Sequence, residues 1–280
     1  MFRSIFLRSL TLIALLQAGT CLAQLAADIN EAVHSVPLRD TSIVMTTFKP
    51  DGDGPFPFVI LSHGRAGDPA DRAKIRRYRY APQARWFVQR GLAVIVPTRL
   101  GYGNVTADPE NAYSCRDPLY QQALHGGVET LRAVIEYARE LPFIDRARFI
   151  MVGQSVGGFL TVGMAAVNPP GMLAGINFAG GHGGQPKLTP GVPCAHEKLA
   201  SVFGNAGKTA RVPMLWIYTE NDSYFNPDTA RLAHERFTKA GGRARLVVAP
   251  AFQNDGYRLF VQGINEWRPI VEEFLTSLGL

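Results

Sequence analysis

The stretch Gly153-Gln154-Ser155-Val156-Gly157-Gly158 lies between an apolar run, RFIMV (148–152), and a helix-compatible segment, FLTVGMAAV (159–167). It is a G-x-S-x-G pattern in the strand, sharp turn and helix context that the motif requires. The flanking glycines suit such a turn, because side chains there would collide with the neighbouring backbone. Ser155 is therefore a candidate nucleophile at a helix N-terminus. The alternative is a serine that only caps the helix.

The rest of the chain continues this alternation of strand and helix. SIVMTTF (42–48) alternates as an edge strand does, while continuous apolar runs are typical of strands covered on both faces. The pattern predicts an α/β fold, a doubly wound, mostly parallel sheet with helices on both faces. The predicted inner strands lie within 56–64, 92–98, 148–155, 173–180, 212–220 and 244–250, and the predicted helices are 71–90, 117–140, 156–168, 227–240 and 265–278.

Length and composition favour one domain over residues 24–280. The 280 residues, with 46% hydrophobic and 19% charged side chains, are ordinary for one globular α/β domain. In such a sheet, function collects in the loops at the carboxyl ends of the strands. Loops around 98–116 and 180–200 have the Gly, Pro and Asn content of segments that frame a site.

Two further segments complete the candidate nucleophile site. The run FVILS leads into His63-Gly64-Arg65, where this architecture places one backbone amide of an oxyanion hole; the residue after the nucleophile supplies the other. Arg65 and Val156 are therefore the predicted donors. His63 precedes Ser155 in the chain and is interpreted as a structural histidine of the loop.

An acidic residue follows the strand after the nucleophile unit. Asp222, in Asn221-Asp222-Ser223, stands where the orienting acid of a Ser, Asp, His order belongs. Glu220 still lies within the apolar strand pattern, and Asp228 falls inside the next predicted helix. Asp222 is the predicted acid, with a turn or capping aspartate as the alternative.

Taken together, the segments LSHGRAG, GQSVGG, INFAGG, LWIYTENDSYF and PAFQNDGYRLF resemble the dienelactone hydrolase-like branch of the α/β-hydrolase superfamily, in its exported bacterial form. Dienelactone hydrolase itself uses a cysteine nucleophile. With Ser155 at that position, the chain resembles the esterase-type members, which use a serine. The resemblance implies hydrolysis of a small-molecule ester without a cofactor. It also implies a catalytic histidine after the last strand, often directly after a glycine. Tyr257 occupies that position.

The Tyr257 phenol, with an ordinary pKa near ~10, is protonated at neutral pH and is a poor base for Ser155. His182, in Gly180-Gly181-His182-Gly183-Gly184, is the candidate substitute base, because its loop follows the strand beside that of Ser155. His182 could instead only line the pocket. His125 and His196 are weaker candidates.

The N-terminus has the pattern of a secretory signal peptide. Arg3 and Arg8 precede an apolar run at 10–16 and small residues ending at Ala23, and the run is well below the ~20 residues of a membrane anchor. We expect a periplasmic or secreted protein with no membrane association after cleavage. Export leaves Cys115 and Cys194 in loop-like sequence, and this even count predicts one disulfide between them, with two free thiols as the alternative.

Two function hypotheses follow. The first is an exported serine hydrolase of carboxylic esters, impaired by Tyr257; the second is a non-catalytic binding protein on the same scaffold. The formal charge of +6, or +4 without the two leader arginines, is spread along the chain and does not favour nucleic acid. No H-E-x-x-H, G-x-G-x-x-G or Walker pattern predicts a metal or nucleotide. The substrate and the oligomeric state are left open.

Overall fold

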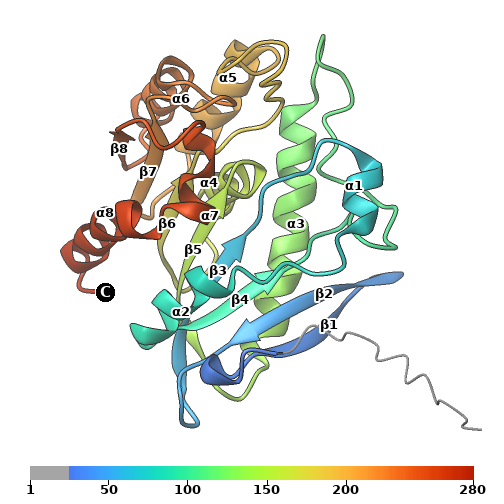
Figure 1. Ribbon diagram of the computed structural model, residues 1–280, viewed down its shortest axis with the longest axis vertical. Coiled ribbons are helices and arrows are strands. Elements are labelled where there is room, and N and C mark those ends of the chain that lie inside the picture. The colour runs from blue at the N-terminus through green and yellow to red at the C-terminus, as the bar shows by residue number, and fades with distance from the viewer. Residues whose placement is uncertain (1–24) are drawn as a thin grey trace, which may run out of the picture.

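The computed structural model describes residues 25–280, so the predicted signal peptide, residues 1–23, lies outside the described part. Over that part the strands form one eight-stranded sheet in the order β1-β2-β4-β3-β5-β6-β7-β8 (Figure 1). The strands are β1 Ala32–Leu38, β2 Thr41–Phe48, β3 Phe56–Ser62, β4 Ala93–Pro97, β5 Ile144–Gln154, β6 Met172–Phe178, β7 Met214–Thr219 and β8 Ala244–Ala249.

The sheet is parallel from β4 to β8 and antiparallel at its β1 end. The predicted doubly wound, mostly parallel sheet is confirmed. The prediction that 42–48 forms the edge was wrong, because β2 lies between β1 and β4. β1 carries Pro37, which has no amide to donate and is tolerated at a sheet edge.

Helices cover both faces of the sheet. Alternate residues of one strand point to opposite faces: Phe58 and Ile60 of β3 pack with α3, α4, α5 and α6, whereas Val59 and Leu61 pack with α2, α7 and α8. The helices are α1 Pro69–Lys74, α2 Ala81–Gln89, α3 Tyr120–Arg139, α4 Val156–Val167, α5 His196–Gly207, α6 Pro227–Lys239, α7 Leu259–Gln262 and α8 Ile264–Ser277.

The predicted helix 71–90 is wrong, because residues between α1 and α2 are not helical. The Tyr78 amide donates to Thr98 Oγ1 at 2.8 Å, and the Tyr78 carbonyl accepts from Thr46 Oγ1 at 2.9 Å. Tyr80 then takes a left-handed conformation with φ 49° just before α2. Bonds to neighbouring strands and loops therefore replace the helical bonds that local propensity favours.

The two loops that the sequence singled out are joined by a disulfide between Cys115 and Cys194. The Cys194 amide also donates to the Gly183 carbonyl at 2.9 Å, and its carbonyl accepts from the Tyr120 hydroxyl. The residues following this loop form α5, which the sequence analysis did not predict. Within residues 25–280, no helix has the length and apolar character needed to cross a membrane.

Candidate active site

Ser155 occupies a sharp turn between β5 and α4. Its backbone has φ 57° and ψ −123°, a conformation that non-glycine residues rarely adopt and that is held here by the strand before and the helix after it. A Cβ on Gly153 would lie 2.1 Å from the Gly157 carbonyl oxygen, and a Cβ on Gly157 would lie 2.0 Å from the Ser62 carbonyl oxygen. The two glycines are therefore required by close backbone packing, as the motif predicts.

A hollow of about 290 Å³ opens over Ser155, and we call it the serine pocket. Arg65, Val156 and His182 line it together with Ser155, so four of the predicted site residues meet there. The backbone amides of Arg65 and Val156 donate no hydrogen bond to any group in the described part of the chain. Both amides are therefore free to bind an oxygen in the pocket.

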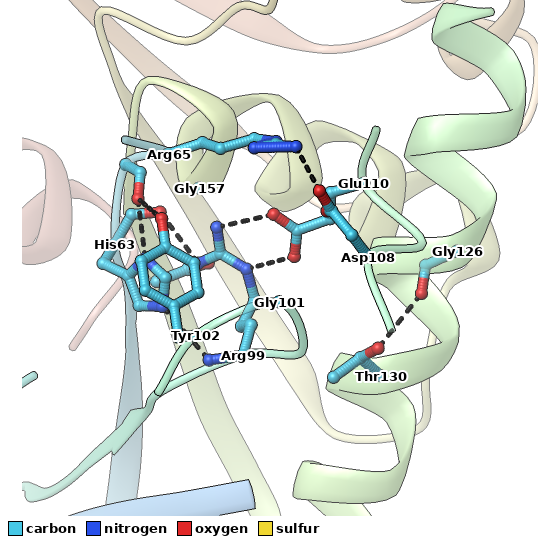
Figure 2. Close-up of polar contacts among 12 residues, drawn as sticks. His63, Arg65, Arg99, Gly101, Tyr102, Asp108, Glu110, Gly126, Thr130 and Gly157 are labelled. Atoms are coloured by element: carbon cyan, nitrogen blue, oxygen red, sulfur yellow. Dashed lines mark hydrogen bonds and ion pairs between the residues drawn. The ribbon is translucent and has the colours of Figure 1, made fainter. Parts of the chain in front are cut away.

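The side chain of Arg65 is held by the loop opposite. Arg65 binds the Asp108 carboxylate (Figure 2). Arg72 binds the same carboxylate at 2.9 Å. Arg65 Nε, by contrast, is buried without a partner among residues 25–280. The guanidinium is thus tied to the loop, while its backbone amide remains free.

Beneath this loop lies a fully buried ion pair between Arg99 and Glu110. Arg99 Nε donates to Glu110 Oε1 at 2.5 Å and Arg99 Nη2 to Glu110 Oε2 at 3.0 Å (Figure 2). Burial lowers the pKa of Arg99, but Glu110 outweighs it and the pKa is raised overall. Arg99 therefore has a structural partner and is not available to meet an anionic ligand.

His63 is a structural residue, as expected. Its Nδ1–H donates to the Gly64 carbonyl at 2.7 Å, and its Nε2 accepts from the Arg99 amide at 3.1 Å. The ring stacks on Tyr78 with centroids 3.8 Å apart. Burial, followed by the charge of Arg99, holds the pKa of His63 well below its usual value. The ring stays neutral and fixes the loop that carries Arg65.

Tyr257 lies against Ser155. A Cβ placed on Gly64 would lie 3.2 Å from the Tyr257 phenol oxygen and 3.3 Å from Ser155 Cβ, so the two side chains converge beside this glycine. Its ring stacks on Tyr224 with centroids 4.0 Å apart. Burial raises the pKa of Tyr257 far above the ordinary phenol value, and the Ser155 contact offsets only part of this shift. The phenol is therefore neutral at any physiological pH.

Asp222 follows β7 and is buried. Its Oδ1 accepts from the amides of Tyr224 at 2.8 Å and Phe225 at 2.9 Å, while its Oδ2 has no partner in the described part of the chain. Burial raises the pKa of Asp222 to about 7; the two amides lower it and Asp255 raises it. Asp222 and Tyr257 line the same small cavity. A carboxylate oxygen thus lies unused beside the residue at the expected histidine position.

His182 lines the serine pocket but has no hydrogen bond to Ser155. Its Nε2–H donates to the Glu110 carbonyl at 2.8 Å, and its Nδ1 is buried without a partner among the described residues. Burial lowers its pKa. The neutral ring therefore carries a lone pair on Nδ1. His125 and His196 do not line the pocket.

Four aromatic side chains near the site divide between pocket and core. Tyr224 and Phe225 line the serine pocket, whereas Phe159 and Tyr102 are buried, with Tyr102 donating to the Gly64 carbonyl at 3.1 Å. Tyr120 was missed by sequence reasoning, although it begins a strongly amphipathic helix beside the pocket. Among residues 25–280, no cluster of three His, Cys, Asp or Glu side chains has the geometry to hold a metal ion.

An eight-stranded α/β sheet with a serine at this turn is the architecture of an α/β hydrolase. The dienelactone hydrolase family model matches residues 51–264, and the chain belongs to that family. It is a hydrolase by family, and the family implies a small-molecule substrate.

Solved structures share the fold at low identity. A putative dienelactone hydrolase from Klebsiella pneumoniae is 19% identical, with a TM-score of 0.60, 87% of this chain and 97% of that chain covered. An esterase from Pyrococcus furiosus is 15% identical, with a TM-score of 0.60 and coverages of 89% and 91%. An acylaminoacyl peptidase from Pyrococcus horikoshii is 15% identical, with a TM-score of 0.63 and 89% of this chain matched, but only 42% of the peptidase.

Proposed function

We propose that the protein hydrolyses carboxylic esters through an acyl intermediate on Ser155. One observation carries the proposal: Ser155 stands at a strained strand-to-helix turn beside an open pocket, between two unengaged backbone amides. In the proposed reaction Ser155 Oγ attacks the ester carbonyl, and the amides of Arg65 and Val156 stabilise the oxyanion. The ester carbon–oxygen bond then breaks and the alcohol leaves, after which water hydrolyses the acyl-serine and releases the acid.

The same site supports only weak catalysis. The Ser155 proton needs an acceptor that later returns it to the leaving group, and a neutral phenol with a raised pKa is not one. Asp222 would orient a base that Tyr257 does not provide. Oxyanion stabilisation and binding alone leave roughly 10³ to 10⁴-fold acceleration over water in other serine hydrolases. We expect activity modestly above that level, the excess being the contribution of the Ser155 nucleophile.

His182 remains the candidate substitute base. The Glu110 carbonyl would hold its Nε2–H in the way that the acid holds the histidine of a triad, leaving Nδ1 as the proton acceptor. A motion of the glycine-flanked loop would be needed to bring Nδ1 to Ser155. The proposal therefore makes activity depend on His182 as well as on Ser155.

The test is hydrolysis of p-nitrophenyl acetate and butyrate by the purified protein and by its Ser155→Ala, His182→Gln and His196→Gln forms. We expect Ser155→Ala to lower the rate, because it removes the acyl-serine route and leaves only oxyanion stabilisation and binding. His182→Gln lowers it if His182 is the base, whereas His196→Gln, at a partly exposed position outside the pocket lining, serves as the matched control. Equal rates for wild type and Ser155→Ala would refute the ester hydrolase.

A second function, ligand binding without catalysis, is favoured by one specific observation. The Asp222 Oδ2 that would receive a histidine N–H has no partner among the described residues, while Tyr257 fills the adjoining space. A lost base would disable the chemistry while leaving the pocket intact. The Tyr257→His variant separates the two functions, because restored activity means that the rest of the site is complete.

We also propose that the protein is exported. Support comes from the leader-like sequence of residues 1–23 and from the Cys115–Cys194 disulfide, a bond that persists in oxidising compartments. The test is cell fractionation of the full chain and of a chain with Leu12 and Leu15 replaced by Arg. A periplasmic or secreted full chain and a retained variant are expected; equal retention of both would contradict export.

A further inference from the structure

A second hollow adjoins the serine pocket on the side of Tyr257. We call it the tyrosine cleft, and it is lined by Tyr78, Tyr80, Tyr224 and Tyr257 together with Arg65 and residues of the 255–262 turn. Its volume is about 460 Å³, within the ~300 to 1,000 Å³ of small-molecule sites. Arg65 and Tyr224 line both hollows, so one ligand could reach from the serine pocket into the cleft.

The cleft is aromatic, and its rings are held in place. Tyr224 stacks on Tyr257, Tyr78 stacks on the fixed ring of His63, and Tyr80 meets Phe260 edge to face at 5.2 Å. All four tyrosines remain partly exposed. Preorganised ring faces and edges favour a flat aromatic ligand over a saturated one of the same size, because aromatic pairs gain attraction beyond the area that they bury.

The position of the cleft indicates which part of an ester it holds. In a serine hydrolase the base gives the proton to the leaving group, so the leaving group lies on the side of the base. Tyr257 occupies the expected base position and lines the cleft but not the serine pocket. The acyl part then belongs in the serine pocket and the alcohol part in the cleft.

The chemistry of the site also favours esters whose alcohol part is aromatic. A Ser155 Oγ–carbon bond forms and the ester carbon–oxygen bond breaks, so the departing oxygen either takes up the Ser155 proton or leaves as an anion while that proton passes to water. A phenol ionises near pH ~10, so its oxygen leaves as an anion far more readily than that of an aliphatic alcohol. A site without an efficient proton donor therefore acts preferentially on aryl esters.

We propose that the tyrosine cleft binds the aromatic alcohol of aryl esters. This leaving-group role rests on the proposed ester hydrolysis, whereas ring binding by the cleft does not. The first test is calorimetric titration of the purified protein with 2-naphthol and with decahydro-2-naphthol, the saturated molecule of the same skeleton. Binding of 2-naphthol at least about threefold tighter is expected, the gain of one aromatic contact. Equal affinity for the two compounds would overturn the proposal.

Variants locate the binding. Tyr80→Leu and Tyr224→Leu should each weaken 2-naphthol binding about threefold to tenfold, whereas Tyr80→Phe, which keeps the ring, should not. Tyr113→Leu is the matched control, because Tyr113 is exposed and lines the serine pocket but not the cleft. Melting temperatures identify any Leu variant that fails to fold. If Tyr80→Leu and Tyr224→Leu both fold and both bind 2-naphthol with unchanged affinity, the ring binds elsewhere and the proposal is overturned.

Kinetics test the leaving-group role. 2-Naphthol should lower kcat/KM for p-nitrophenyl acetate hydrolysis at concentrations near its measured Kd, in the wild type or in Tyr257→His, whichever turns over the ester. An unchanged kcat/KM at these concentrations contradicts the role. If neither protein shows turnover that depends on Ser155, the proposed function and the leaving-group role both fail, while the binding comparison still decides whether the cleft takes aromatic rings.

Discussion

The ring of Tyr224 stacks on the ring of Tyr257 with centroids 4.0 Å apart and planes 27° apart. Tyr224 lies two residues after Asp222, whose Oδ1 accepts its amide. The loop that carries Asp222 therefore packs directly on Tyr257, which occupies the expected position of the catalytic histidine. This contact holds the phenol over Ser155 and defines the change that should restore catalysis.

Replacing Tyr257 with His should raise kcat/KM for p-nitrophenyl acetate by about 10² to 10⁴-fold, the contribution of a positioned general base. The imidazole would find Ser155 on one side and the unpaired Asp222 Oδ2 on the other. Steady-state kinetics measure the gain, and Tyr257→Phe, which removes only the hydroxyl, is the control. A rate for Tyr257→His no higher than that of Tyr257→Phe would mean that other parts of the site are also incompetent.

Asp222 should make the protein less stable as pH rises from about 4 to 7. Its pKa is raised to about 7 in the folded protein, against 3.8 ordinarily, so the unfolded chain loses this proton first. The folded state binds more protons in that range, and the free energy of unfolding therefore falls with pH, by about 3 to 4 kcal/mol at most.

The Asp222→Asn variant tests this dependence, because Asn cannot ionise. Urea unfolding of both proteins at intervals from pH 4 to pH 8 should show the variant gaining stability relative to wild type up to about pH 7, then no further change. A constant difference across this range would contradict the raised pKa.

Breaking the buried Arg99–Glu110 pair should be costly. Glu110→Gln leaves the Arg99 guanidinium buried without a counter-charge, and the expected loss in the free energy of unfolding is about 3 to 5 kcal/mol. The control is Glu129→Gln, which removes an exposed pair with Arg132 and should cost less than about 1 kcal/mol. Similar losses for both variants in chemical denaturation would mean that burial does not govern the cost.

Removing the disulfide should destabilise the protein and loosen the serine pocket. The bond joins residues 79 apart in the chain, for which loop entropy gives about 4 kcal/mol. The Cys115→Ser, Cys194→Ser double variant should show this loss in urea unfolding, and dithiothreitol should lower the stability of wild type but not of the variant. Equal sensitivity of the two proteins to dithiothreitol would point to another cause.

Sequence analysis predicted the sheet and its main strands, because strands buried on both faces correspond to continuous apolar runs in the sequence. It also placed Ser155, Arg65 and Val156 around one pocket, since the motif fixes the turn that carries them. It missed the break before α2, where Thr46 and Thr98 bond to Tyr78, because such bonds join residues distant in the chain. It missed the tyrosine cleft for the same reason.

The roles of the site residues remain predictions that the experiments above test. Sequence could identify Tyr257 as the departure from the family pattern, since that depends only on its place after Gly256. It could not find the unpaired Asp222 Oδ2 or the commitment of His182 Nε2 to the Glu110 carbonyl. Both depend on where loops from separate strands meet.

The disulfide between Cys115 and Cys194 has a consequence for the order of assembly. The strands of the sheet pair without it, whereas both cysteines belong to the wall of the serine pocket. We expect a chain that folds without an oxidant to complete its core but to lack the covalent bond across the wall of its pocket. Binding, rather than the sheet, would then depend on whether the thiols meet an oxidant.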